Sequence, residues 1–127
     1  MTPATPLLST LESFLKLTNS REQAISANMA NVDTPGYHTQ DIDFESELKK
    51  AVNGIQSESE YGSRTAQMNP VVEEVQGLME RPDGNNVNLD REGMLMAETQ
   101  LQYQIGVQLV KHQFHQILSA ITGGGQS

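Results

Sequence analysis

Cysteine and tryptophan are absent from this 127-residue chain, and only 5% of its residues are aromatic. Without cysteine, disulfides and thiolate metal sites are excluded. Only 36% of the residues are hydrophobic, which leaves a compact globule little to bury. The length fits one domain without a second independent core, and we expect the isolated chain to be marginally stable or partly unfolded.

Long hydrophobic runs are also missing. No apolar run approaches the ~20 residues that cross a bilayer, and residues 1–20 do not combine a basic start with an uninterrupted apolar core. We therefore expect neither a membrane anchor nor a Sec signal, so any export would use a different route.

The formal net charge of −8 is concentrated in the middle of the chain. Residues 33–84 carry eleven acids and four bases, whereas residues 1–32 are neutral and residues 85–127 have a net charge of −1. An acidic middle segment argues against nucleic acid and anionic lipid as partners. Neutral flanks favour close packing against copies of themselves.

Residues 4–32 show the apolar periodicity of a long amphipathic helix, which we expect to run from Thr5 to Val32. Seven of nine positions spaced alternately by four and three are apolar, and this spacing is typical of a heptad seam. The apolar members are Ala4, Leu8, Leu11, Leu15, Ile25, Met29 and Val32.

Thr34-Pro35-Gly36 is expected to end this helix. Pro35 disfavours helical geometry at Thr34, and Gly36 can adopt positive φ in the turn that follows. Asn28 and Asn31 are spaced i, i+3 in the last turn. Their amides could cap the turn or bridge to another helix.

The C-terminal segment carries a second seam, in which eight of ten positions are apolar. We expect Asn88 to cap this helix and Gly123-Gly124-Gly125 to end it. A further apolar stripe lies off the seam at Leu101, Ile105, Leu109 and Leu118, and a two-helix hairpin would leave it exposed. The apolar seam members are Leu89, Met96, Tyr103, Val107, Val110, Phe114, Ile117 and Ile121.

The acidic insert between the seams combines a short helix with irregular segments. Asp43 is expected to cap a helix that ends near Gly54. Residues 56–70 are interpreted as a mobile loop, because their composition cannot offset the entropy of ordering. Residues 71–78 fit either a strand or a helical turn, and residues 81–86 form a turn.

These patterns predict an all-α fold, in which long terminal helices pair in a coiled-coil-like axial assembly. The chain divides into an N-terminal axial helix, an acidic insert, and a C-terminal axial helix with a Gly-rich tail, over residues 1–34, 35–84 and 85–127. The alternative is an antiparallel hairpin within one chain, which could act as a soluble adaptor for one partner helix.

A metal site is a weaker alternative. His112 and His115 are spaced i, i+3, and His38 or Glu98 could complete a ligand set. The sequence contains no His-Glu-x-x-His pattern, so polar surface positions are the favoured interpretation of these histidines.

Other ligand and catalytic patterns fail. Residues 41–52 alternate acids as calcium loops do, but Ser46 replaces the required glycine and Val52 replaces the final glutamate. Nucleophile elbows and phosphate-binding glycine loops are missing. We therefore expect no cofactor, no metal and no enzymatic activity.

Residues 27–37 are similar to a signature shared by bacterial flagellar rod and hook proteins. The segment reads Ala-Asn-Met-Ala-Asn-Val-Asp-Thr-Pro-Gly-Tyr and matches the family pattern Ala-Asn-x-x-Asn-x-x-Thr-Pro-Gly-Tyr. Residues 83–92, 96–98 and 101–104 resemble the members that form the proximal rod, and the absence of a large middle domain fits the same group. The resemblance covers residues 7–55 and 80–121. It departs from the family at Asn88, where aspartate is frequent, and at Gly93, where a larger residue is usual.

The resemblance implies a structural subunit of the flagellar basal-body rod, which forms the wall of a periplasmic tube. It also implies export through the flagellar type III apparatus, in agreement with the missing Sec signal. The implied partners are copies of the chain, other rod proteins such as FlgC, the rod-base adaptor FliE and the MS ring, with no nucleic acid and no direct membrane insertion.

In this hypothesis folding is conditional: the terminal segments become helical only when neighbouring subunits cover their apolar stripes. The residues expected to carry assembly are Leu8, Leu11, Leu15, Ile25, Met29, Met96, Tyr103, Val107, Val110, Phe114 and Ile117. The residues expected to set the bend into the insert are Asn28, Asn31, Thr34, Pro35, Gly36 and Tyr37.

Overall fold

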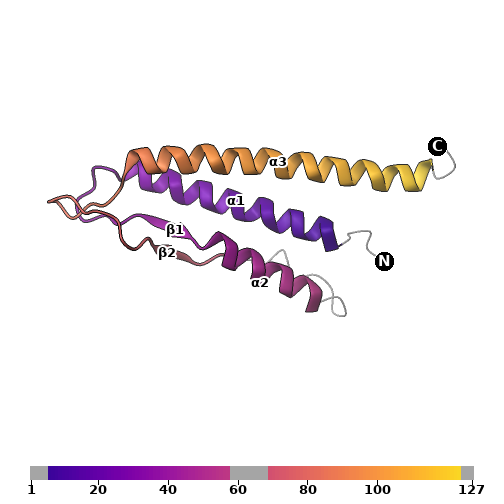
Figure 1. Ribbon diagram of the computed structural model, residues 1–127, viewed down its shortest axis with the longest axis horizontal. Helices are drawn as coiled ribbons and strands as arrows, with labels where there is room; N and C mark the ends of the chain where they lie inside the picture. Colours follow the sequence, from indigo (N-terminus) through magenta and orange to yellow (C-terminus); the bar gives the residue numbers. More distant parts are fainter. Residues whose placement is uncertain (1–5, 58–68, 124–127) are drawn as a thin grey trace.

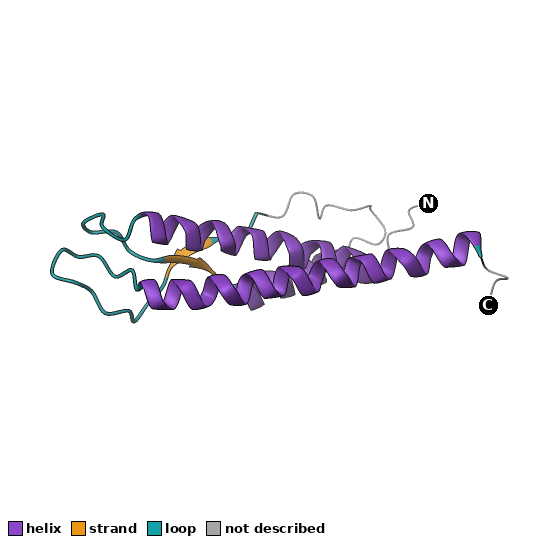
Figure 2. Cartoon of the chain, turned by 90° about the horizontal axis from the view of Figure 1, so that it is seen from above, coloured by secondary structure: helices purple, strands orange, loops and turns teal. Residues whose placement is uncertain are grey.

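The computed structural model describes residues 6–57 and 69–123, which form three helices and two short strands. Helices α1 and α3 lie side by side, and α2 follows another side of α1 together with the strands (Figure 1). The turns that join α1 to β1 and β2 to α3 gather at one end of this elongated arrangement (Figure 2). The predicted helical fold with long terminal helices is confirmed. In chain order the elements are α1 (Pro6–Ala30), β1 (Gln40–Ile42), α2 (Phe44–Ser57), β2 (Val72–Glu74) and α3 (Leu89–Thr122).

Helix α1 ends at Ala30 rather than at the predicted Val32. A turn follows, in which the N–H of Thr34 donates to the carbonyl of Asn31 at 3.0 Å. Gly36 has a φ of 76°, a conformation that costs glycine little because it has no Cβ. The helix stop predicted at this segment is confirmed.

Helix α3 is capped at both ends as predicted. The side chain of Asn88 accepts a hydrogen bond from the N–H of Arg91 at 3.1 Å, and the helix continues for 34 residues to Thr122. The N–H of Gly123 then donates to the carbonyl of Ser119 at 2.9 Å. Within the described ranges, neither α3 nor another helix has the apolar length that a membrane span requires.

The insert forms helix α2 and a two-stranded antiparallel sheet. The carboxylate of Asp43 accepts the N–H of Ser46 at 3.2 Å, which confirms the predicted cap. The helix continues to Ser57, beyond its expected end near Gly54. The rings of Phe14 and Phe44 meet edge to face with centroids 5.5 Å apart, and this contact joins α2 to α1.

The sheet itself was not predicted. Gln40 lies opposite Glu74, and Ile42 lies opposite Val72. The sequence left residues 71–78 undecided and gave no sign of a strand before α2, because three-residue strands carry too little periodicity to detect. The greater part of the loop predicted over residues 56–70 lies outside the described residues.

The apolar core is small. Among the described residues six hydrophobic side chains are buried, and four of them belong to α1. Helix α1 therefore lies between α3 and the insert and supplies most of what this chain buries by itself. The six are Leu11, Leu17, Ala24, Ile25, Ile42 and Val87.

Substitution of two glycines of α3 by alanine is expected to change the stability of the fold in opposite directions. A Cβ added at Gly93 would meet no atom within 4 Å, whereas one at Gly106 would lie 2.6 Å from Cδ2 of Leu15 on α1. We expect Gly93→Ala to stabilise the fold by about 1 kcal/mol through helix propensity. Gly106→Ala should destabilise the fold by about 1 kcal/mol. The added methyl group gains the same helix propensity, but the cost of overpacking against Leu15 of α1 is larger.

Thermal unfolding followed by circular dichroism measures both variants. The measurement is made in trimethylamine N-oxide, which shifts a marginal chain toward the folded state. Equal stabilisation by the two variants would show that α1 and α3 do not need the close approach at Gly106.

Candidate functional site

The side chain of Asn28 joins three parts of the chain at the end of α1. Its amide nitrogen donates to the carbonyl of Gln40 at 2.8 Å and to Oε1 of Glu92 at 2.9 Å. Its amide oxygen accepts the N–H of Gln40 at 2.9 Å and the hydroxyl of Tyr37 at 3.1 Å. Asn28 is 1% exposed, and four hydrogen bonds satisfy a primary amide completely. This side chain therefore fixes α1, β1 and α3 relative to one another.

Glu92 supplies a fully buried carboxylate in the first turn of α3. Its second oxygen accepts a hydrogen bond from Nη1 of Arg91 at 2.8 Å, and its position near the helix N-terminus favours negative charge. Burial, followed by the charge of Glu92, raises the pKa of Tyr37. Tyr37 therefore keeps its proton and remains a donor to Asn28.

Asn85 closes the C-terminal end of α1 from the other half of the chain. Its amide nitrogen donates to the carbonyls of Asn31 and Thr34, each at 2.9 Å. Its amide oxygen accepts the N–H of Val87 at 2.7 Å, and the residue is 0% exposed. Both carbonyls also accept a backbone N–H in the turn after α1, so Asn85 adds a second hydrogen bond to each and ties this turn to the segment before α3.

Asn86 holds the same two segments together one residue later. Its amide oxygen accepts the N–H of Thr39 at 2.7 Å, and its backbone N–H donates to the carbonyl of Tyr37 at 3.2 Å. A Cβ added at Gly84 would lie 3.3 Å from Cα of Gly36. Both glycines have positive φ, so this close crossing of the two turns favours glycine on each side.

We call this set of contacts the asparagine interlock. It brings together the two segments that resemble the flagellar proteins, although residues 38–82 separate them in the sequence. It fixes the geometry of one end of the α1–α3 pair and offers no arrangement of nucleophile, base and oxyanion donors for catalysis. Its members are Asn28, Tyr37, Gln40, Asn85, Asn86 and Glu92.

The sequence predicted part of the interlock. Asn28 bridges to another helix, and Asn31 caps the turn by donating to the carbonyl of Ala27 at 2.8 Å and accepting the hydroxyl of Thr34 at 3.0 Å. Both uses that were expected for these amides are confirmed. The role of Glu92 was missed, because only its place near the helix N-terminus was visible in the sequence.

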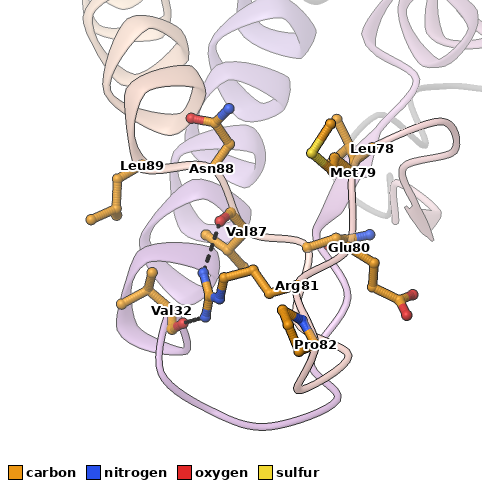
Figure 3. Close-up of a pocket in the computed structure, with 10 residues that line it drawn as sticks. Val32, Leu78, Met79, Glu80, Arg81, Pro82, Val87, Asn88 and Leu89 are labelled. Atoms are coloured by element: carbon orange, nitrogen blue, oxygen red, sulfur yellow. Dashed lines mark hydrogen bonds between the residues drawn. The ribbon is translucent and has the colours of Figure 1, made fainter.

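Arg81 also joins the turn after α1 to the segment before α3 (Figure 3). Its guanidinium donates to the carbonyl of Val32 and, at 3.4 Å, to the carbonyl of Val87. It also lies 3.7 Å from a carboxylate oxygen of Asp83. The guanidinium is therefore engaged within its own chain, at the edge of a pocket that is described below.

His38 joins the insert to the segment after β2. Its Nδ1 lies 3.2 Å from Oε1 of Glu74, and its Nε2 lies 3.0 Å from Oε2 of Glu80. The hydrogen bond to Glu74 is the largest cause that raises the pKa of His38, while desolvation opposes it and the charges of both carboxylates support it. Both ring nitrogens can donate only in the imidazolium form.

This contact predicts a pH dependence of stability. Because the pKa of His38 is raised on folding, its contribution is fully present below the ordinary imidazole pKa of ~6.5 and is lost as the pH rises through the higher folded value. We expect the melting temperature in trimethylamine N-oxide to fall between pH 6 and pH 8.5 by more in the native chain than in His38→Gln. The same decrease in both proteins would contradict this assignment.

The predicted seam of α1 is largely covered inside the chain. Leu11 and Ile25 are buried, and Leu8, Leu15 and Met29 are half-buried. The α3 residues predicted to carry assembly are less covered. Met96, Val107, Val110 and Ile117 are half-buried, whereas Tyr103 and Phe114 are 44% and 57% exposed.

Helix α3 turns a different set of residues toward the protein interior. Glu92, Thr99 and Gly106 are its buried residues, spaced by seven. These polar and small side chains leave most large apolar side chains of α3 outside. On this helix the exposed large hydrophobic residues are Leu89, Met94, Leu101, Tyr103, Ile105, Leu109, Phe114, Leu118 and Ile121.

The histidines proposed as an alternative metal site do not gather. Residues 6–57 and 69–123 contain no group of three histidine, cysteine or carboxylate side chains that could hold a metal ion. His112 instead lies 3.3 Å from the side-chain nitrogen of Gln116.

Three similar curated proteins all carry the same name. No protein-family model matches the chain. The flagellar basal body rod protein FlgB of Salmonella typhimurium is 34% identical over 122 residues, which cover 87% of this chain and 88% of the relative. FlgB of Escherichia coli is 32% identical over the same shares, and FlgB of Proteus mirabilis is 31% identical over 87% of this chain and 89% of its own length.

Proposed function

Since the chain belongs to the family of the flagellar basal body rod protein FlgB and is a structural subunit of the rod, we propose that it assembles into the proximal rod through its terminal helices. The observation that carries this proposal is the exposed apolar surface of α3. Among the described residues, thirteen large hydrophobic side chains are exposed and six hydrophobic residues are buried. A helix with apolar residues on several sides is stable when other helices surround it.

The two terminal helices have different parts in this proposal. Helix α1 connects the insert to α3 within one subunit, while α3 presents its outer surface to neighbouring subunits. Tyr103 and Phe114 lie on that surface, and Met96, Val107, Val110 and Ile117 are half-buried. The asparagine interlock fixes the angle at which the helices leave their connecting turns.

The location and partners follow the same proposal. The subunit reaches the periplasm through the flagellar type III export apparatus and packs against copies of itself, FlgC-like rod proteins, the adaptor FliE and the MS ring. The net negative charge is concentrated in the insert, so the terminal helices, which carry little net charge, make these contacts.

Isolated basal bodies provide the direct test. A strain that lacks its own FlgB is supplied with this chain, and its basal bodies are purified and imaged. We expect swimming to be restored and the chain to be traced in the proximal rod. Restored swimming with no density for the chain in the rod would overturn the proposal.

Conditional folding predicts low helix content in the free subunit. Helices α1 and α3 comprise 25 and 34 residues, and we expect circular dichroism of the dilute protein to show less than about half of this helix, since tertiary burial supplies most helix stability. Trimethylamine N-oxide should raise the helix content. Full helicity with a cooperative thermal transition in buffer alone would contradict conditional folding.

A soluble helical-hairpin adaptor is the second candidate, because the α1 seam is already covered within the chain. An adaptor would bind one partner helix with fixed stoichiometry. Sedimentation of the chain with partner proteins separates the candidates, since a rod subunit forms larger assemblies as concentration rises.

A further inference from the structure

A pocket lies at the end of the molecule where the connecting turns gather (Figure 3). We call it the end pocket; its volume is about 570 Å³. Met79 is 91% exposed and Leu89 is 51% exposed, so two of its apolar lining side chains face solvent. Its apolar lining residues are Val32, Leu78, Met79, Val87 and Leu89.

The chain segment that leads into the end pocket carries more acids than bases: residues 78–92 contain Glu80, Asp83, Asp90 and Glu92 against Arg81 and Arg91. Asp33 and Asp90 follow two lining residues directly in the sequence and are exposed. Glu80 lines the pocket, and its carboxylate lies 3.0 Å from Nε2 of His38. The only base among the lining residues is Arg81, and its guanidinium is engaged by two backbone carbonyls of its own chain. The excess of acids at this end of the chain therefore favours a basic ligand.

The opposite end of the molecule has the complementary chemistry. Contacts between Asn28 and Glu92, and the approach of Gly106 to Leu15, set the register of the antiparallel helices. In this register α3 continues past Pro6, the first described residue of α1 (Figure 1). We call residues 114–122 of α3 the helix overhang.

The helix overhang is apolar and lies beside basic groups. Phe114, Leu118 and Ile121 are 57%, 50% and 71% exposed. After Glu98 the sequence has no acidic side chain, and Lys111 with His112 and His115 are its basic residues. One end of the chain thus displays an apolar helix end with positive charge, and the other displays an apolar pocket with negative charge.

We propose that the end pocket receives the C-terminal end of a long helix from the axially adjacent rod subunit, a helix end with the chemistry of the overhang: large apolar side chains, bases and no carboxylate side chain. This inference rests on the proposed function and specifies one of its contacts. Such a contact joins unlike surfaces, so it does not close on itself and extends an assembly along an axis. A volume of about 570 Å³ is in the range of clefts that hold a whole ligand, so it accommodates several apolar side chains of the inserted helix end.

A peptide of residues 107–123 of this chain is the probe. A nitroxide is attached at its C-terminus, and the amide NMR spectrum of the isotope-labelled full-length protein is recorded in trimethylamine N-oxide. We expect signal loss for residues 78–89. Signal loss confined to residues 101–109, or no loss at any residue, would overturn the proposal.

Charge exchange tests the recognition chemistry. Met79→Lys and Asp90→Lys are each expected to weaken peptide binding about tenfold, which corresponds to the loss of one buried apolar side chain or one charge contact. Leu101→Lys, on α3 away from the pocket, is the matched control and should leave binding unchanged. A Lys111→Glu peptide should recover affinity for the Asp90→Lys protein, and failure of this exchange would remove the charge complementarity on which the proposal depends.

Peptide binding and incorporation into basal bodies together distinguish failure of the end pocket proposal from failure of the proposed function. If the unmodified chain enters basal bodies but the peptide does not bind, the end pocket proposal is wrong and the rod function stands. If the chain is absent from basal bodies, the proposed function itself fails.

Discussion

Ile105→Asp is expected to abolish incorporation of the chain into rods and swimming, while the isolated protein stays as soluble and as helical as before. Ile105 is 50% exposed, so the substitution removes little packing inside the chain. In an assembled rod the new carboxylate would be buried without a partner. Such burial costs several kcal/mol, and about 4 kcal/mol already weakens an interface roughly a thousandfold.

Gln104→Asp provides the matched control. Gln104 is exposed beside Ile105 on the same helix, and the substitution adds the same charge at a polar position. We expect wild-type amounts of this variant in purified basal bodies, measured by immunoblot, and normal spreading in soft agar. Normal swimming of Ile105→Asp would contradict burial of this surface, and equal loss in both variants would attribute the defect to charge alone.

The helices could be predicted from the sequence, but the rotation of α3 about its axis could not. Apolar periodicity placed the α3 seam at positions that include Tyr103 and Phe114, both of which are exposed. The face that meets α1 carries Glu92 and Gly106 instead. A buried carboxylate with a specific partner and a glycine that permits close approach decide this rotation, and neither contributes to a hydrophobic pattern.

The long-range contacts of the asparagine interlock could not be predicted from the sequence either. Local rules indicated that Asn28 would bridge or cap, because a polar amide in an apolar region needs partners. They could not identify Glu92 as the partner, since 64 residues separate the two positions. From their neighbours in the sequence, Asn85 and Asn86 were predicted to be turn residues. Their burial results from contacts with the α1 end, which only the folded chain brings near.

Asn28→Asp is expected to cause the largest loss of stability of any conservative substitution in this chain. The amide nitrogen of Asn28 lies 2.9 Å from Oε1 of Glu92, so the variant places two carboxylates in contact within a buried site. Breaking a buried charged contact costs about 3–5 kcal/mol, which is comparable with the whole stability of a small domain. Thermal unfolding in trimethylamine N-oxide, with helix content followed by circular dichroism, measures the loss.

A double-mutant cycle separates this contact from general disruption of the α1 end. Glu92→Gln alone should cost about 2 kcal/mol, because the side chain loses its charge but retains an acceptor for Asn28. In the double variant the new amide at position 92 can donate to the new carboxylate at position 28, so we expect at least about 2 kcal/mol of the Asn28→Asp loss to be recovered. Tyr37→Phe removes only one hydroxyl from the same amide and should cost about 1 kcal/mol. Additive losses in the double variant would show that Asn28 and Glu92 do not act on each other, and the rigid joint between α1 and α3 would then need another origin.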